Sequence, residues 1–330
     1  MKVTISDVAR LAGVSTATVS HTINGTRYVS TETKDKVYHA IAELGYTPDA
    51  SARSFRTGKK KTIGFIVPDI SNKFFSTMIE TVEDYLSAKG YHLIIANTKE
   101  NPQREETNIR LLTAGLVDGL LVASTMDDFA RFDELIPAGF PVVLVDRTFP
   151  VQKYASVTVS NFQPIYRAVC RLAGKGCRRI GLIAGLDRLS STQERVLAYR
   201  EAIADCGLEA SERLIRYNDL KEDCALRCLD HLLMNEACDA LLVCQGVMAT
   251  VAFSYLHITG KAKELELVGF VDYDAGFNDP YYVGADRIIQ PVGALGEAAG
   301  EQILRRIEEP DAPAFEKVLT SEYKPFQSNL

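Results

Sequence analysis

A chain of 330 residues is long enough for two or three domains, and its 46% hydrophobic and 24% charged residues are typical of a globular protein. Its longest apolar runs, such as Ile63–Val67, are too short to span a membrane, and no secretory signal is visible at its start. We therefore expect a cytoplasmic protein. The net charge is −6, yet residues 1–61 carry +5 and the rest carries −11. A basic segment on an acidic body favours a nucleic-acid-binding head.

The first 45 residues predict three short helices separated by glycines. The first helix has an N-cap at Thr4 and ends at Gly13, since a glycine takes the left-handed conformation at a helix end. The second is capped by Ser15 and ends at Gly25, and the third closes at Gly45. Two short helices joined by a glycine turn, with a third supporting them, predict a helix-turn-helix domain.

The second of these helices has a surface suited to reading bases. Val19 and Ile23 face inward, and short polar or small side chains face outward: Thr16, Ala17, Ser20 and His21. Such side chains approach base edges and thymine methyl groups closely. The pattern alone fits a small helical bundle with solvated Ser and Thr equally well.

The following residues favour DNA binding. Small side chains such as Ala52 allow a helix to sit deep in a minor groove, and Phe55 can wedge between base pairs. Arg53 and Arg56 would neutralise adjacent phosphates, and a basic linker follows at residues 57–61.

The run from Thr4 to Arg56 resembles the headpiece and hinge of the lactose-repressor (LacI) family of bacterial transcription regulators. The residues that carry the resemblance include Ile5–Ala9, Ala12–Ser15, Thr18–Ser20, Ile23-Asn24, Val29-Ser30, Thr33–Val37 and Gly45–Pro48, and the recognition helix is most similar to the purine-repressor type. Two positions depart from the family, since Phe55 replaces a usual leucine and Asp49 a frequent asparagine. The resemblance implies these DNA-binding residues: Thr4, Ser15, Thr16, Ala17, Thr18, Ser20, His21, Asn24, Tyr46, Ala52, Arg53, Phe55 and Arg56.

From residue 62 onward, apolar strands alternate with helical stretches. The predicted strands are Thr62–Val67, Tyr91–Ala96, Gly119–Ala123, Val142–Val145, Val157–Val159, Ile180–Ala184, Leu241–Cys244 and Leu267–Val271. The predicted helices include Phe74–Lys89, Arg104–Gly115, Phe162–Gly174 and Ser191–Cys206. This alternation predicts an α/β fold with parallel sheets covered by helices on both faces, and the length predicts two doubly wound lobes. The expected domains are a headpiece (1–47), a hinge helix and linker (48–61) and a two-lobed body (62–330).

Ligands of such sheets bind beyond the carboxyl ends of the strands. The polar and aromatic residues at those ends form a set suited to a polyol, because flat apolar faces stack on a ring while charged and amide groups bond hydroxyls. The body is similar to periplasmic sugar-binding proteins, above all the ribose type. Together these imply the following effector-binding residues: Asn72, Phe74, Phe75, Asp146, Arg147, Ser191, Arg195, Gln245, Asp272 and Gln290.

The resemblance further implies that Phe74 and Phe75 sandwich a sugar ring. Asp272 is favoured as a ligand carboxylate, with Asp274 as the second choice, and Gln245-Gly246 replaces the family's usual Asn-Asp. Paired with Arg147, Asp146 is expected to stay ionised and to bind rather than shuttle protons.

The sequence therefore predicts a homodimeric repressor, or a tetramer, that binds a pseudo-palindromic operator and responds to a small sugar. Two helices are candidates for the dimer contact, with apolar residues Ile79, Val82 and Phe253, which core packing explains equally well. An exported sugar receptor, or a corepressor-dependent regulator with a non-sugar effector, is the alternative. No nucleophile–base pair, cofactor loop or metal-ligand spacing is present, and the seven cysteines form no CxxC pair, so we expect no enzyme, cofactor or metal.

Overall fold

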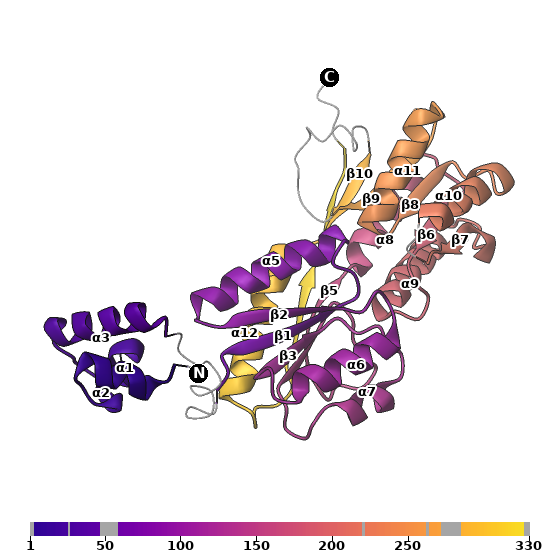
Figure 1. Cartoon of the computed structure of the whole chain (residues 1–330). Coiled ribbons are helices and arrows are strands. Elements are labelled where there is room, and N and C mark those ends of the chain that lie inside the picture. Colours follow the sequence, from indigo (N-terminus) through magenta and orange to yellow (C-terminus); the bar gives the residue numbers. More distant parts are fainter. Residues whose placement is uncertain are drawn as a thin grey trace. The chain divides into compact units, whose positions relative to one another are not determined.

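The computed structural model describes residues 3–25, 27–46, 59–219, 222–261, 264–271 and 285–326. The chain divides into two compact units, Met1–Lys60 and Lys61–Leu330, which we call the headpiece and the body (Figure 1).

The headpiece contains the three predicted helices, α1 (Ile5–Ala12), α2 (Thr16–Asn24) and α3 (Thr31–Leu44). Both the backbone N–H and the hydroxyl of Thr4 donate to Oδ2 of Asp7, at 3.0 and 2.7 Å, which fixes the start of α1. At the end of α1, Gly13 has φ +66°, so a side chain there would be strained. Five buried residues form the core of the headpiece: Val8, Ala9, Val19, Val37 and Ala40.

The body consists of two lobes, each built on a six-stranded sheet. The first sheet has the order β11-β5-β4-β3-β1-β2 and the second has the order β12-β10-β9-β8-β6-β7. The elements of the first lobe are β1 (Thr62–Val67), α5 (Lys73–Ala88), β2 (His92–Asn97), α6 (Pro102–Thr113), β3 (Gly119–Val122), α7 (Phe129–Leu135), β4 (Val142–Val145), β5 (Ala155–Ser160), α12 (Val292–Glu308) and β11 (Glu316–Thr320).

The second lobe holds the remaining elements. They are α8 (Phe162–Gly174), β6 (Ile180–Ala184), α9 (Ser190–Asp205), the 3₁₀ turn η1 (Glu212–Leu214), β7 (Ile215–Tyr217), α10 (Glu222–Asp230), the π-helical turn η2 (His231–Asn235), β8 (Ala240–Val243), α11 (Gly246–Ile258), β9 (Glu266–Val271), β10 (Asp286–Ile289) and β12 (Glu322–Lys324). All strand pairs are parallel except β10 with β12.

Successive side chains of a strand point to opposite faces of the sheet, so each lobe has two hydrophobic cores, one on each face. In the first lobe, Phe65 packs in the cluster that contains residues of α5 and α12, whereas its neighbour Ile66 packs in the cluster that contains residues of α6 and α7. In the second lobe, Leu182 packs with α8 and α9, and Ile183 packs with α10 and α11. The interior strands are buried on both faces, as parallel strands covered by helices require.

The chain passes between the lobes three times, because β5, β10 and β11 are each followed by an element of the other lobe. Two of these crossings are joined by a buried hydrogen bond, since the hydroxyl of Ser321 donates to Oδ1 of Asn161 at 2.7 Å. Glu194 of α9 accepts from the hydroxyl of Ser160 at 2.7 Å and from the backbone N–H of Asn161 at 3.0 Å. These two crossings are therefore bonded to each other and, through Glu194, to α9.

The structure confirms the predicted fold class and adds four strands that the sequence pattern did not indicate. These are β7, β10, β11 and β12, of which β7, β11 and β12 lie at sheet edges. The candidate dimer-contact residues lie in the cores instead: Val82 and Phe253 are buried, and Ile79 packs against the same core as Val82. Their helical spacing reflects packing within the protomer, because an amphipathic pattern does not distinguish a core from an interface.

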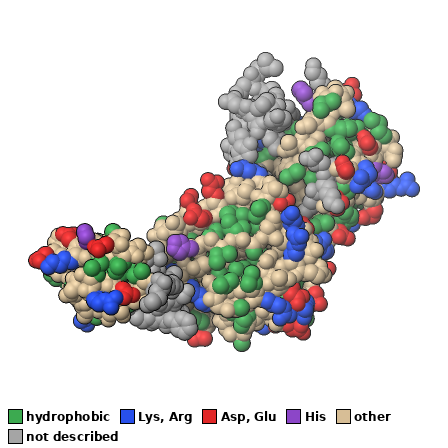
Figure 2. Space-filling view, in the orientation of Figure 1, with side chains coloured by type: hydrophobic (Ala, Val, Ile, Leu, Met, Phe, Trp, Pro, Cys, Tyr) green, Lys and Arg blue, Asp and Glu red, His purple; other side chains and the backbone are tan. Residues whose placement is uncertain are grey.

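The edge strand β2 carries an exposed apolar surface. Figure 2 shows hydrophobic side chains gathered over this part of the body, and Ile94 and Ile95 of β2 are 38% and 45% exposed. None of the described helices is long and apolar enough to cross a membrane.

Candidate functional site

The headpiece presents the start of α2 to solvent. Ser15, Thr16 and Ala17 are exposed, while Val19 behind them is buried against α1 and α3. Ser15 caps the helix by accepting from the backbone N–H of Thr18 at 3.1 Å. The positive end of the helix dipole therefore carries only small side chains, which allows close approach of an anionic surface.

The other predicted DNA-binding residues of the headpiece make internal contacts. The amide of Asn24 donates to the backbone oxygen of Ser20 at 2.7 Å, and the hydroxyls of Thr18 and Ser15 are 2.8 Å apart. Tyr46 packs against the headpiece core, and His21 is half-buried. The predicted hinge residues lie outside the described residues: Asp49, Ala52, Arg53, Phe55 and Arg56.

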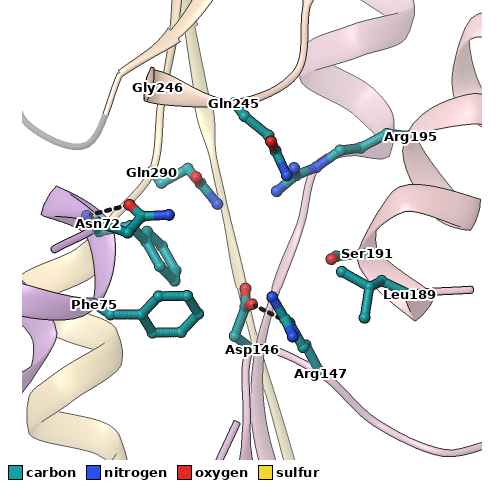
Figure 3. Close-up of a pocket in the computed structure, with 11 residues that line it drawn as sticks. Asn72, Phe75, Asp146, Arg147, Leu189, Ser191, Arg195, Gln245, Gly246 and Gln290 are labelled. Atoms are coloured by element: carbon teal, nitrogen blue, oxygen red, sulfur yellow. Dashed lines mark hydrogen bonds and ion pairs between the residues drawn. The ribbon is translucent and has the colours of Figure 1, made fainter. Parts of the chain in front are cut away.

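In the body, a small cavity of about 50 Å³ lies between the lobes, and we call it the inner pocket. It is lined by nine of the ten predicted effector-binding residues together with Leu189 and Gly246: Asn72, Phe74, Phe75, Asp146, Arg147, Ser191, Arg195, Gln245 and Gln290. The tenth, Asp272, lies outside the described residues, as does the alternative Asp274. Figure 3 shows Arg195, Gln245 and Gln290 pointing into the pocket from one side and Asp146 and Arg147 from the other.

The aromatic wall comes from the start of α5. Oδ1 of Asn72 accepts from the backbone N–H of Phe74 at 3.1 Å, so its side chain caps the helix beside the pocket. The rings of Phe74 and Phe75 pack edge to face, with centroids 5.1 Å apart and planes at 85°. They do not offer the two parallel faces of the expected sandwich, because each ring also fills the core of the first lobe.

The acidic group of the pocket follows β4. Asp146 has φ +66°, a conformation unusual for a residue with a side chain and frequent at functional sites. The expected pair with Arg147 forms at 3.7 Å. Burial nevertheless raises the pKa of Asp146, although Arg147 and Arg195 oppose the rise. Asp146 is therefore protonated more easily than the sequence analysis expected.

Arg147 is held by a residue that the sequence analysis did not single out. Its guanidinium donates to both carboxylate oxygens of Glu100, at 3.0 and 2.6 Å, and to the backbone oxygen of Ser124 at 3.2 Å. Glu100 itself has φ +54°. Both Glu100 and Ser124 follow strand ends, so the rule that found the other residues applies to them as well.

Arg195 is held from the second lobe. One guanidinium nitrogen donates to the backbone oxygen of Cys244 at 2.6 Å, and the group lies 4.6 Å from the centroid of the Phe270 ring. Nε of Arg195 and Nε2 of Gln290 are buried without a hydrogen-bond partner among the described residues. Unpaired buried donors are costly, so these two groups are suited to receiving a ligand's oxygens.

Gly185 follows β6 and keeps room for the amide of Gln245. A Cβ at Gly185 would lie 2.6 Å from Nε2 of Gln245 and 2.8 Å from Oγ1 of Thr192. The absence of a side chain there lets these polar groups lie close to the backbone. No group of metal-ligating side chains is present in the parts of the chain that the structure describes.

A second cavity, of about 430 Å³, adjoins the inner pocket, and we call it the outer cavity. Arg147 and Leu189 line both spaces. The remaining lining residues are Ser124, Met126, Asp127, Thr148, Phe149, Pro150, Arg188, Ser190 and Gln193. None of them was among the predicted effector-binding residues, although several, such as Ser124 and Thr148, lie as close to strand ends as the predicted residues do.

Comparison with known proteins agrees with this arrangement. Residues 4–49 match the bacterial regulatory proteins of the lacI family, and residues 60–279 match the periplasmic binding proteins and sugar binding domain of the LacI family. The chain belongs to the lacI family. This LacI-family protein is a DNA-binding transcription regulator with a sugar-binding type of effector domain, as the resemblance of its headpiece and body predicted.

Named relatives of this LacI-family protein cover nearly all of it. It is 33% identical to the ribose operon repressor of Haemophilus influenzae over 93% of both chains. It is 32% identical to the transcriptional repressor PurR of Photobacterium profundum, over 93% of this chain and 92% of the relative. A solved complex of the transcriptional regulator CelR with cellobiose matches 98% of both chains, with 26% identity and a TM-score of 0.71. Both curated relatives are repressors rather than enzymes.

Proposed function

We propose that this protein is a cytoplasmic transcriptional repressor that binds a pseudo-palindromic operator and is controlled by a small sugar in the inner pocket. The observation that carries the effector assignment is the convergence of nine strand-end residues on one cavity between the lobes. Guanidinium, carboxylate and amide groups beside aromatic rings match a polyol, which both donates and accepts hydrogen bonds. The cellobiose complex of the related CelR is consistent with a sugar ligand.

We further propose that a homodimer binds the operator, because a pseudo-palindromic site pairs with a two-fold symmetric protein. The exposed residues Ile94 and Ile95 on the edge strand β2 favour a contact between protomers at this surface. An apolar edge strand that is open to solvent tends to pack against another chain. Equilibrium sedimentation separates a dimer from a tetramer. An Ile95→Lys variant is expected to favour the monomer and to weaken operator binding.

In the proposed mechanism, a sugar closes the two lobes about the hinge formed by the three crossings. Closure changes the spacing of the paired headpieces, and operator affinity changes with it. The Asn161–Ser321 hydrogen bond joins two of the three crossings, which favours a rotation of the lobes about them.

The test of DNA binding starts with selection of duplexes from a random pool by the full chain, followed by fluorescence anisotropy. Ala17→Glu places a negative charge at the exposed start of α2, and we expect it to abolish specific binding. Ala42→Glu on α3 is the matched control, because it adds the same charge at another exposed helical position. Equal binding by both variants would contradict the assignment of α2 as the recognition helix.

The test of the effector site uses thermal-shift screening of sugars, then anisotropy with the selected operator. Arg195→Ala is expected to remove the response to the sugar and to leave operator affinity unchanged. The sign of the response in the unmodified chain distinguishes an inducer from a corepressor. Binding of purines but of no sugar would replace the sugar assignment with a non-sugar corepressor.

A further inference from the structure

Two half-buried cysteines of the second lobe lie in contact with each other. Cys170 lies near the end of α8, and Cys206 is the residue that follows α9. The Sγ of Cys206 donates to the Sγ of Cys170 at 3.2 Å. A disulfide bond is about 2.05 Å long, so the two sulfurs need to approach by only about 1 Å to become bonded.

The helices that carry these thiols are already bonded to each other elsewhere. α8 and α9 lie side by side (Figure 1). Near the starts of both helices, Glu194 accepts from the backbone N–H of Asn161 at 3.0 Å. Further along, the hydroxyl of Tyr166 donates to Oδ2 of Asp205 at 2.7 Å, one residue before Cys206. The separation of the two backbones around the sulfurs is therefore fixed, and a bond between the thiols requires little movement of either helix.

Both sulfurs are open to a small oxidant, whereas most of the other cysteines are not. The four buried cysteines are Cys177, Cys228, Cys238 and Cys244. Burial and the hydrogen bond with Cys170 raise the pKa of the Cys206 thiol to about 11. Because the thiolate is the nucleophile, Cys206 is not the cysteine that reacts first.

We propose that Cys170 and Cys206 form a site of reversible oxidation, at which hydrogen peroxide joins α8 to α9 through a disulfide bond. The thiolate of Cys170 attacks one peroxide oxygen, the O–O bond breaks, and a sulfenic acid forms while the other oxygen takes a proton and leaves as water. The sulfur of Cys206 then attacks the sulfenic sulfur, so that the S–S bond forms, the S–O bond breaks and a second water leaves. Two thiols lose two electrons in total, and one peroxide is reduced to two waters.

The disulfide protects the protein and leaves its binding sites intact. A sulfenic acid beside a second thiol becomes a disulfide, whereas a sulfenic acid without a partner is oxidised further to a sulfinic acid that is not reduced again. Cys206 lies roughly 16 Å further along α9 than Arg195, because each helical residue adds about 1.5 Å. The inner pocket is therefore not altered by the bond.

Peptide mapping of the full chain without reductant tests the proposal. Hydrogen peroxide is expected to link the tryptic peptide 168–171, which contains Cys170, to the peptide 201–213, which contains Cys206. Dithiothreitol should separate the two peptides again. Because the bond joins residues 36 positions apart, the midpoint of thermal unfolding should rise by roughly 5 to 10 °C. Affinity for the selected operator should not change.

Three serine variants assign the roles of the cysteines. In Cys206→Ser, Cys170 has no thiol partner, so dimedone should trap it as the sulfenic acid, and longer treatment should give the sulfinic acid. In Cys170→Ser, Cys206 should stay reduced under the same treatment. Cys224→Ser is the matched control, because Cys224 is the third half-buried cysteine, and this variant should form the same linked peptides as the unmodified chain.

Three results would overturn the proposal. The first is the absence of the link between peptides 168–171 and 201–213, or its loss in Cys224→Ser. The second is a link that joins two copies of the chain, which a denaturing gel without reductant separates from a link within one chain. The third is a linked protein with a lowered midpoint of thermal unfolding, since the two helices would then not accommodate the bond.

Discussion

The two hydrogen bonds between Glu100 and Arg147 allow a prediction of how much stability the protein loses when they are removed. Replacement of Glu100 by alanine removes both hydrogen bonds to the guanidinium, which is held at 7% exposure. Arg147 keeps the backbone oxygen of Ser124 at 3.2 Å and the more distant Asp146 at 3.7 Å. The charge is therefore left partly paired in a pocket that water reaches poorly.

The expected loss of stability is about 2 kcal/mol. Breaking a fully buried pair costs about 3–5 kcal/mol. The carboxylate of Glu100 is 20% exposed, and the surviving contacts of Arg147 recover part of the loss, so the lower figure follows. Sugar affinity should fall about 10-fold, because the guanidinium no longer has a fixed position.

The assay is urea unfolding with parallel titration of the sugar. Glu212→Ala is a matched control, since Glu212 also bonds both oxygens to an arginine, Arg200, but at 72% and 48% exposure. The control should lose less than about 0.5 kcal/mol. If both variants lost the same small amount, burial would not be what makes the Glu100 pair strong, and the reasoning would fail.

Two further predictions concern Glu105 and Gly185. Burial raises the pKa of Glu105 above its ordinary 4.5, so its contribution to stability is largest below that pH and is lost as pH rises through the raised pKa. The Glu105→Gln variant cannot ionise at this position, so its stability should rise relative to that of the unmodified chain as the pH increases above about 4.5. The test is urea unfolding over a range of pH. Free energies of unfolding that change with pH in the same way for both proteins would contradict the prediction. Gly185→Ala should displace the amide of Gln245 and weaken sugar binding about 10-fold, while the free energy of unfolding changes by less than about 1 kcal/mol. Sugar affinity is measured by calorimetry. An unchanged affinity would show that the amide does not bind the sugar.

The sequence predicted the fold where strands are buried on both faces. Strands β1, β4 and β6 begin and end at the predicted residues, because apolar runs such as Ile63–Val67 have no alternative to a buried position. The strands β11 and β12 were not predicted. A strand at a sheet edge needs only one apolar face, so its sequence does not contain the continuous apolar run on which the prediction relied. Interior strand β10 begins with the charged pair Asp286 and Arg287, which are buried here among polar partners.

The residues of the inner pocket were predictable because one geometric rule places them. The parallel strands of each sheet end at one edge, and both of these edges line the inner pocket. Asp146 after β4 of the first sheet and Gln245 after β8 of the second, about 100 positions apart, therefore converge without any local signal. The same rule places Glu100, which follows β2, near the pocket, but its pairing with Arg147 is a specific side-chain contact that the rule does not define. The edge-to-face packing of Phe74 and Phe75 is likewise a product of side-chain packing, which sequence spacing does not encode.

The late return of the chain to the first lobe has a consequence for synthesis. Strand β11 completes the first sheet by pairing Glu316 with Ser156, and α12 supplies residues such as Leu295 and Ile303 to the same core. A ribosome makes these elements only after all of the second lobe except β12 has been synthesised. The first lobe therefore stays incomplete until nearly the end of the chain, and until then it holds an uncovered apolar face and an open strand edge. A nascent chain stopped before Val292 should bind chaperones, whereas a headpiece, complete by Leu44, should already be folded.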